Sequence, residues 1–196
     1  IVIIDDNSDD DTYQIIKSFQ EVHSNIKYYK NSANGKVAGT IFGIKQCNYE
    51  WIKFVDGDDY LNLDTLETDF FKGNVIYHDY WAVNKNSKSL HSTKIKDSLR
   101  FLKRGRTLPK GMFFCKKDVL LDSFPPPYDM IFEDFWINFV CLSNKSLFYL
   151  NQPLYFYRQH DKNFYGTNDS FTKFKMKRMG NRYLNVVPKI SERYEF

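Results

Sequence analysis

The sequence lacks the long apolar runs and the cysteine pairs that mark two broad classes of protein. No segment approaches the ~18 consecutive apolar residues that a membrane-spanning helix needs. The three cysteines, Cys47, Cys115 and Cys141, form no CxxC pair, and an odd number cannot be fully paired within one chain. We therefore expect a soluble or membrane-surface protein whose thiols stay reduced in the cytoplasm.

Internal repeats and glycine-rich or serine-rich linkers are also absent, so no segment divides the 196 residues into several domains. Large apolar side chains are plentiful: 42% of the residues are hydrophobic, and there are 14 Tyr and 18 Phe. This composition is too apolar for a disordered chain. We expect one folded domain over residues 1–165, followed by a helical appendage over residues 166–196.

Apolar periodicity predicts alternating strands and helices in the first part of the chain. Residues 1–4 are a β-branched run, and residues 15–22 carry apolar side chains at helical spacing before a second strand at 26–29. A helix over 35–47 and a strand over 51–55 follow. This β-α-β order predicts an α/β fold that contains parallel strands.

The second part of the chain is less regular, and it predicts a mixed sheet topology. The expected elements are a strand at 74–83, a helix at 97–104, an apolar segment at 111–115, a rigid loop at Pro125–Pro127, a helix at 132–142, and short strands at 147–150 and 153–158.

The C-terminal segment is basic. From Ser170 onward there are seven Lys or Arg side chains and two Glu side chains, whereas the rest of the chain is close to neutral. A solvated helix face is the favoured interpretation, and contact with an anionic membrane or with nucleic acid are the alternatives. Of these two partners we expect the inner membrane surface, in peripheral contact, and no nucleic acid.

Carboxylates gather where predicted strands end and where a predicted helix begins. The three groups are Asp5-Asp6, Asp56-Gly57-Asp58-Asp59 and Glu133-Asp134. Three carboxylates within four residues repel one another unless a cation lies among them. Hard oxygen ligands favour Mn²⁺ or Mg²⁺, which keep open positions for substrate phosphates. Asp56, Asp58 and Asp59 therefore predict a metal site that takes a nucleoside diphosphate.

A calcium loop and a metal-free acidic turn are the alternatives at this position. An EF-hand loop starting at Asp56 would place Glu67 correctly, but Leu61 stands where glycine is required and Tyr60 where an oxygen ligand is expected. The calcium alternative fails, whereas an acidic turn without metal stays open.

Five segments, in this order, carry a resemblance to a known family: IVIIDDNSDD, NGKVAGTIFGI, WIKFVDGDD, FEDFW and YFYRQH. Together they resemble the family-2 glycosyltransferases of the GT-A type. The resemblance implies a Rossmann-like, three-layer α/β fold with a mixed central sheet. It also implies metal-dependent transfer of a sugar from a nucleoside diphosphate sugar, with UDP expected, to a saccharide or lipid-linked saccharide acceptor.

The resemblance also implies roles for individual residues. Asp134, with Glu133 beside it, would be the catalytic base, which removes the proton of the acceptor hydroxyl as it attacks the anomeric carbon. Asp56, Asp58 and Asp59 would hold the metal. The nucleotide sugar would be bound by Asp5, Asp6, Lys36, Asp56, Asp58, Arg158 and His160. Residues 110–112 would border the acceptor pocket.

Structural explanations compete with several of these roles. Glu133 and Asp134 could only cap a helix, Lys36 could be an exposed lysine at a helix start, and a lone histidine such as His160 is more often structural. Members of the family also begin with an additional strand and helix, and this chain starts on what would be their second strand. We therefore expect an N-terminally incomplete catalytic domain.

Three functions follow from these patterns. The first is an inverting glycosyltransferase that builds surface polysaccharide or glycolipid. The second is a nucleotidyltransferase, which the sequence supports less because it contains no glycine-rich phosphate loop. The third is a non-catalytic binding module of the same fold whose basic tail contacts membrane or nucleic acid.

Overall fold

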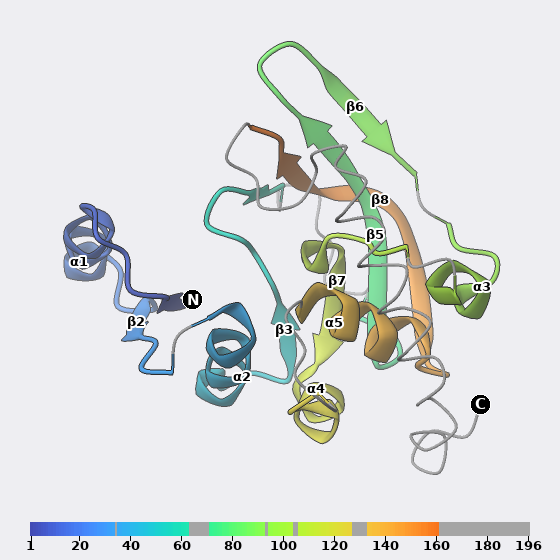
Figure 1. Ribbon diagram of the computed structural model, residues 1–196, viewed down its shortest axis with the longest axis horizontal. Helices are drawn as coiled ribbons and strands as arrows, with labels where there is room; N and C mark the ends of the chain where they lie inside the picture. Colours follow the sequence, from blue (N-terminus) through green and yellow to red (C-terminus); the bar gives the residue numbers. More distant parts are fainter. Residues whose placement is uncertain (34, 63–70, 93, 104–105, 127–132, 161–196) are drawn as a thin grey trace. The chain divides into compact units, whose positions relative to one another are not determined.

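The computed structural model describes residues 1–33, 35–62, 71–92, 94–103, 106–126 and 133–160 (Figure 1). The chain divides into two compact units. Unit 1 comprises residues 1–52 and 116–136, and unit 2 comprises residues 53–115 together with the chain from Ile137 onward. The expected appendage over residues 166–196 lies outside the described residues.

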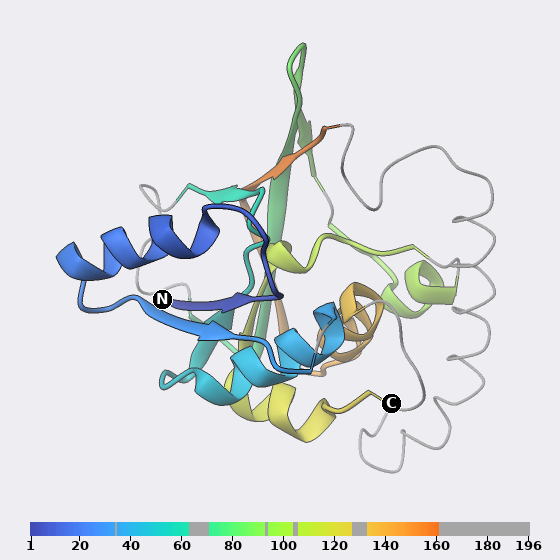
Figure 2. The ribbon, with the colours of Figure 1, turned by 60° about the vertical axis from the view of Figure 1, so that its left-hand side comes forward.

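Unit 1 begins with a β-α-β arrangement, as the sequence predicts (Figure 2). Strand β1 (Val2–Asp5) leads into helix α1 (Thr12–Val22), and strand β2 (Lys27–Lys30) returns parallel to β1. The register pairs Asp5 with Lys30. Because parallel strands end at the same edge, the residues that follow Asp5 and Lys30 lie close together.

Two further helices belong to unit 1. Helix α2 (Lys36–Gln46) packs closely on β1, since a Cβ at Gly43 would lie 3.1 Å from Ile4 Cγ1. Helix α4 (Lys117–Ser123) contacts α2 and was not predicted. Its seven residues are too few to show a clear helical period in the sequence.

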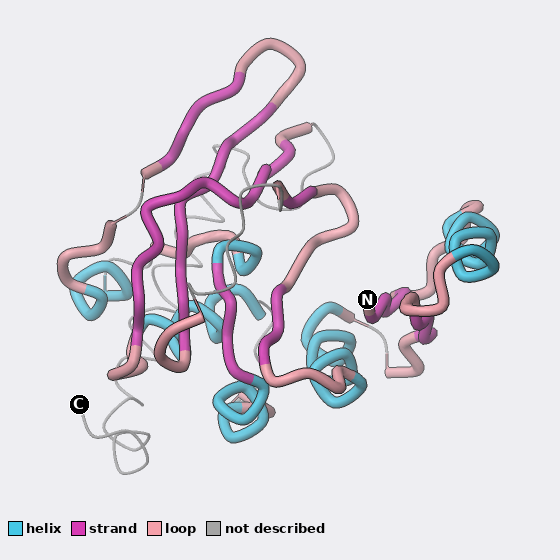
Figure 3. The backbone as a smooth tube through the Cα atoms, turned by 180° about the vertical axis from the view of Figure 1, so that it is seen from behind, coloured by secondary structure: helices cyan, strands magenta, loops and turns pink. Residues whose placement is uncertain are grey.

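The larger sheet is mixed, with five strands in the order β3-β7-β5-β8-β4 and β6 paired to β5 off this path. Its central strand β5 runs antiparallel to β6 and β7 and parallel to β8, while β8 pairs antiparallel with β4 (Figure 1). Figure 3 shows the strands from behind, in magenta. These pairings confirm the predicted mixed α/β class. The strands are β3 (Trp51–Lys53), β4 (Tyr60–Leu61), β5 (Val75–Val83), β6 (Lys88–His91), β7 (Phe113–Lys116) and β8 (Leu147–Arg158).

The core of unit 2 forms around β5 and β8. Val75, Ile76, Leu154 and Tyr155 are fully buried on these strands. The part of helix α5 (Glu133–Leu142) that belongs to this unit is buried from Ile137 to Leu142. Two short elements, α3 (Ser98–Lys103) and the 3₁₀ turn η2 (Lys110–Met112), connect the strands, and η2 is itself buried.

Strand β8 differs from the prediction of two short strands at 147–150 and 153–158. It is continuous because its pairing with β5 continues across a register shift, where His78 faces Leu150 but Asp79 faces Pro153. The residues between Leu150 and Pro153 form an irregularity in the strand, of the kind a β-bulge produces. Proline, which cannot donate to the ladder, is accommodated at such irregularities.

Among the helices of the described residues, none combines the length and the apolar character that crossing a bilayer requires. Even α5, which is buried along most of its length, has only ten residues. A membrane-spanning helix needs about twenty.

We predict that Gly111→Ala destabilises the fold by about 3 kcal/mol, the upper part of the range for overpacking a core. A Cβ at Gly111 would lie 2.1 Å from the ring of the fully buried Tyr155, so the ring or the η2 turn would have to move. Thermal or urea denaturation measures the change.

Gly57→Ala is the matched control, because a Cβ at Gly57 meets no atom within 4 Å. It should change stability by less than about 0.5 kcal/mol. Equal losses in the two variants would contradict the packing argument.

Candidate functional site

Asp5, at the end of β1, is held by hydrogen bonds within unit 1. Its Oδ1 accepts bonds from the Ser8 backbone N–H at 2.9 Å and from the Ser8 hydroxyl at 2.6 Å, and its Oδ2 accepts one from the Tyr28 hydroxyl at 2.7 Å. Ser8, helped by Tyr28 and Lys30, lowers the pKa of Asp5 from its ordinary value of 3.8 although burial opposes this. Asp5 therefore shapes the loop that follows β1.

Asp6 anchors the start of helix α2. Its Oδ1 accepts bonds from the Gly35 N–H at 2.8 Å and from Asn31 Nδ2 at 2.7 Å. Gly35 has a φ of +92°, a conformation that glycine adopts readily, and the next residue is Lys36. The structure thus brings Asp6 and the backbone preceding Lys36 together, and the binding of a nucleotide sugar by these two residues stays a prediction.

Asn31 is a member of this group that the sequence analysis missed. It is buried, it follows β2 at the edge where β1 ends, and its amide donates to Asp6. Its position directly after a predicted strand was the signal that could have identified it.

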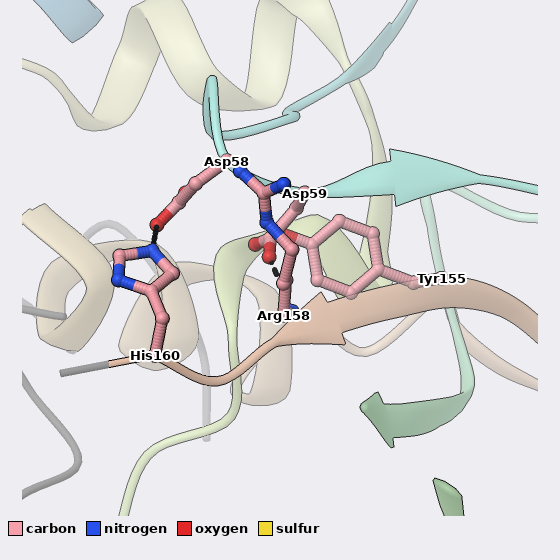
Figure 4. A network of polar contacts seen from close by, with 5 residues as sticks. All are labelled: Asp58, Asp59, Tyr155, Arg158 and His160. Carbon is pink, nitrogen blue, oxygen red and sulfur yellow. Dashed lines mark hydrogen bonds and ion pairs between the residues drawn. The ribbon is translucent and has the colours of Figure 1, made fainter. Parts of the chain in front are cut away.

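The loop of residues 56–59 lies in unit 2, between β3 and β4. Antiparallel pairing of β4 with β8 places Tyr60 opposite Phe156, so the residues before Tyr60 face those that follow Phe156. His160 Nε2 consequently lies 3.0 Å from Asp58 Oδ2 (Figure 4). Both side chains are partly exposed, at 34% and 37% respectively.

Asp59 is turned toward β8 rather than toward Asp58. Its Oδ2 accepts a hydrogen bond from the Tyr155 hydroxyl, and its Oδ1 accepts one from the Arg158 N–H at 2.7 Å (Figure 4). The pKa of Asp59 is raised to about 6, chiefly because the side chain is partly buried. The hydrogen bonds from Tyr155 and Arg158 oppose this rise, and the nearby carboxylates of Asp58 and Asp56 add to it.

Asp56 forms an ion pair with a lysine of the η2 turn. Lys110 Nζ, in the η2 turn, lies 2.5 Å from Asp56 Oδ1. The sequence analysis placed residues 110–112 at the border of an acceptor pocket and did not foresee this ion pair. Lys110 and Asp56 are 54 residues apart in the chain, so no local pattern connects them.

The three aspartates are therefore not arranged around one point. Among the described residues, no group of three or more His, Cys, Asp or Glu side chains is placed to hold a metal ion. The repulsion argument drawn from the sequence assumed that only a cation could relieve the crowding. Instead, Lys110, His160 and the β8 donors each engage a different carboxylate.

Glu133 and Asp134 occupy the first turn of α5, as the sequence predicts. Glu133 is 2% exposed, whereas Asp134 is partly exposed. Carboxylates in the first turn are stabilised by the helix dipole, which also accounts for them without catalysis. The role of Asp134 as a base stays a prediction.

The first part of the chain matches a known protein family. Residues 1–70 match the model of glycosyl transferase family 2. This segment belongs to glycosyl transferase family 2. It contains the acidic residues 5, 6, 56, 58 and 59 together with Lys36, whereas Glu133, Asp134, Arg158 and His160 lie beyond the part matched by the family model.

Relatives extend the similarity further along the chain. A GalNAc(5)-diNAcBac-PP-undecaprenol beta-1,3-glucosyltransferase of Campylobacter jejuni is 28% identical over 178 residues, which cover 81% of this chain and 54% of the relative. The poly(ribitol-phosphate) beta-N-acetylglucosaminyltransferase TarS of Staphylococcus aureus is 31% identical over 68 residues, 34% of this chain and 12% of that protein. The glycosyltransferase GlyA of Streptococcus pneumoniae is 25% identical over 103 residues, 50% of this chain and 15% of that protein. The chain thus spans about half the length of the first relative and much less of the others.

We predict that Ser8→Ala moves the pKa of Asp5 upward toward 3.8, because it removes the hydroxyl donor that contributes most to the lowered value. A lowered pKa stabilises the family 2 segment above pH 3.8, and this contribution is lost as the pH falls through the lowered value. The variant should therefore be about 1 kcal/mol less stable than the wild type at neutral pH. On acidification, its free energy of unfolding should fall by less than that of the wild type.

Carboxyl-carbon NMR titration measures the pKa of Asp5, and denaturation at pH 7 and pH 3 measures the stability. Ser18→Ala is the control, since the Ser18 hydroxyl donates to the Ile15 carbonyl within α1. An unchanged Asp5 titration in Ser8→Ala would show that the hydroxyl does not determine the pKa.

Proposed function

We propose that the protein is an inverting glycosyltransferase that transfers a sugar from a nucleoside diphosphate, with UDP favoured, to a hydroxyl of a saccharide or lipid-linked saccharide acceptor. The family 2 match over residues 1–70 supports the reaction class. The observation that carries the proposal is the Asp58–His160 pair, because it joins the acidic loop to the segment after β8 at 3.0 Å.

Family 2 enzymes typically use a divalent metal, and the Asp58–His160 pair fits one. Adjacent ligands of an octahedral ion with bonds of about 2.1 Å lie about 3 Å apart, which is the separation of Asp58 Oδ2 from His160 Nε2. Two protein donors also suffice for ions such as Mg²⁺ or Mn²⁺, because phosphate oxygens and water complete their coordination. Asp58 and His160 would therefore hold the ion, and Asp56 and Asp59 would support the loop.

Two groups of described residues have side chains that suit a nucleotide sugar. Asp6 and Asn31, which follow β1 and β2, offer hydrogen-bonding groups to the nucleoside, and Lys36 follows Gly35, whose N–H donates to Asp6. Arg158 is exposed beside the acidic loop and suits the diphosphate, to which a guanidinium donates several hydrogen bonds.

The transfer requires a base for the acceptor. The acceptor oxygen would form a bond to the anomeric carbon from the face opposite the diphosphate, and its proton would pass to the Asp134 carboxylate. The bond between the anomeric carbon and the phosphate oxygen breaks, and its electron pair leaves with the diphosphate. A bound divalent ion supplies a Lewis acid for the charge of that leaving group.

The names of two relatives support the stereochemistry and the acceptor class. Both the Campylobacter and the Staphylococcus protein are named as forming beta linkages, which inversion of an alpha-linked nucleotide sugar produces. Their named acceptors are an undecaprenol-linked glycan and poly(ribitol-phosphate). We infer an acceptor in surface glycan synthesis, and a lipid-linked one would place the protein on the cytoplasmic side, at the inner membrane surface.

We predict that UDP with Mn²⁺ raises the melting temperature by about 5 °C or more at a hundredfold excess over the dissociation constant. Asp58→Ala should abolish the Mn²⁺-dependent part of this shift, because it removes one of the two proposed metal donors. Differential scanning fluorimetry with and without EDTA measures the effect.

Asp122→Ala, on the exposed face of α4, is the control carboxylate and should keep the whole shift. If UDP and Mn²⁺ do not change the melting temperature of the wild type, the result would favour the alternative of a non-catalytic binding module.

We predict that Asp134→Asn lowers the rate of sugar transfer by about 100-fold or more while UDP binding is preserved, because the amide cannot accept the acceptor proton. Turnover is measured with a panel of UDP, GDP and dTDP sugars, and binding by calorimetry. Asp122→Asn should leave both quantities unchanged. Full turnover in Asp134→Asn would refute its role as base.

A further inference from the structure

Lys110 is a buried cation that the proposed reaction does not use. Its side chain is 6% exposed and its Nζ lies 2.5 Å from Asp56 Oδ1, while the Asp56 side chain is 29% exposed. Lysine is almost never buried to this extent without a charged partner. The pair is therefore a fixed feature of unit 2.

The same turn also packs near Asp59, at the other end of the acidic loop. Gly111, next to Lys110, approaches the Tyr155 ring so closely that a Cβ there would overlap it. The Tyr155 hydroxyl in turn donates to Asp59. The η2 turn thus contacts the first carboxylate of the loop and packs against the tyrosine that donates to the last one.

A direct role of Lys110 toward the donor diphosphate fits this geometry poorly. A phosphate-binding lysine needs an accessible ammonium group, and Lys110 is more deeply buried than the carboxylate it contacts. Arg158, by contrast, is exposed at the same loop. The ammonium group of Lys110 therefore acts on Asp56.

We propose that Lys110 is a positioning residue that withholds Asp56 from the divalent ion and offsets its charge, so that Asp58 is the carboxylate presented to the metal and the diphosphate. This inference rests on the proposed function. Each aspartate of the loop then has a separate role. Lys110 contacts Asp56, and Tyr155 and the Arg158 N–H donate to Asp59. Asp58 faces His160.

Lys110→Met tests the proposal, because it removes the cation and keeps an unbranched side chain. Without Lys110, Asp56 becomes available to the ion, so the variant should bind Mn²⁺ about fivefold to tenfold more tightly in the absence of nucleotide. UDP binding at saturating Mn²⁺ should weaken by about the same factor, since the site gains an uncompensated negative charge. Calorimetry measures both constants.

The double variant Lys110→Met/Asp56→Asn separates positioning from simple packing. It removes both charges, so it leaves no unpaired buried ion and should fold even if the single variant does not. Both constants should return to within about threefold of the wild type, because the net charge of the site is restored. If Asp56 is itself a metal ligand, the double variant should instead bind Mn²⁺ at least tenfold more weakly than the wild type, and the proposal is overturned.

The outcomes separate this inference from the proposed function. A wild-type protein that binds neither Mn²⁺ nor UDP overturns both. A wild-type protein that binds them, together with a Lys110→Met variant that is less stable but has the wild-type Mn²⁺ constant, overturns the inference alone and shows that Lys110 has a purely structural role.

Discussion

The acidic loop between β3 and β4 depends on the antiparallel pairing of β4 with β8. This pairing brings Asp59 to the Tyr155 hydroxyl and to the Arg158 N–H, and it brings Asp58 to His160. A two-residue strand such as β4 contributes few ladder bonds of its own. The side-chain contacts of Asp59 therefore help to hold the loop against β8, and the geometry of Asp58 follows from them.

Charge compensation in this loop is divided among different kinds of partner. Lys110 supplies a full positive charge to Asp56, whereas Asp59 receives hydrogen bonds from neutral donors and has a pKa raised to about 6, chiefly by burial. Asp58, whose side chain is 37% exposed, faces an imidazole, which also ligates metals. Each of the three aspartates therefore has its own partner within unit 2.

In unit 1, the carboxylates at the end of β1 also have partners within the unit. Asp5 closes the turn after β1 through Ser8 and Tyr28, and Asp6 fixes the glycine that begins α2. Both carboxylates therefore hold the loops at the ends of β1 and β2 through hydrogen bonds.

The sequence by itself determined the β-α-β start, the mixed α/β class, the acidic residues at strand ends and the acidic first turn of α5, because these follow from local periodicity and from where polar residues succeed apolar ones. It did not foresee α4, β4, β6 or the continuity of β8, whose patterns are short or interrupted by proline. The partner of each aspartate was decided only by the tertiary structure. Lys110, Tyr155 and His160 lie 54, 96 and 102 residues from the carboxylates they contact, and only the pairing of distant strands and turns brings such groups together.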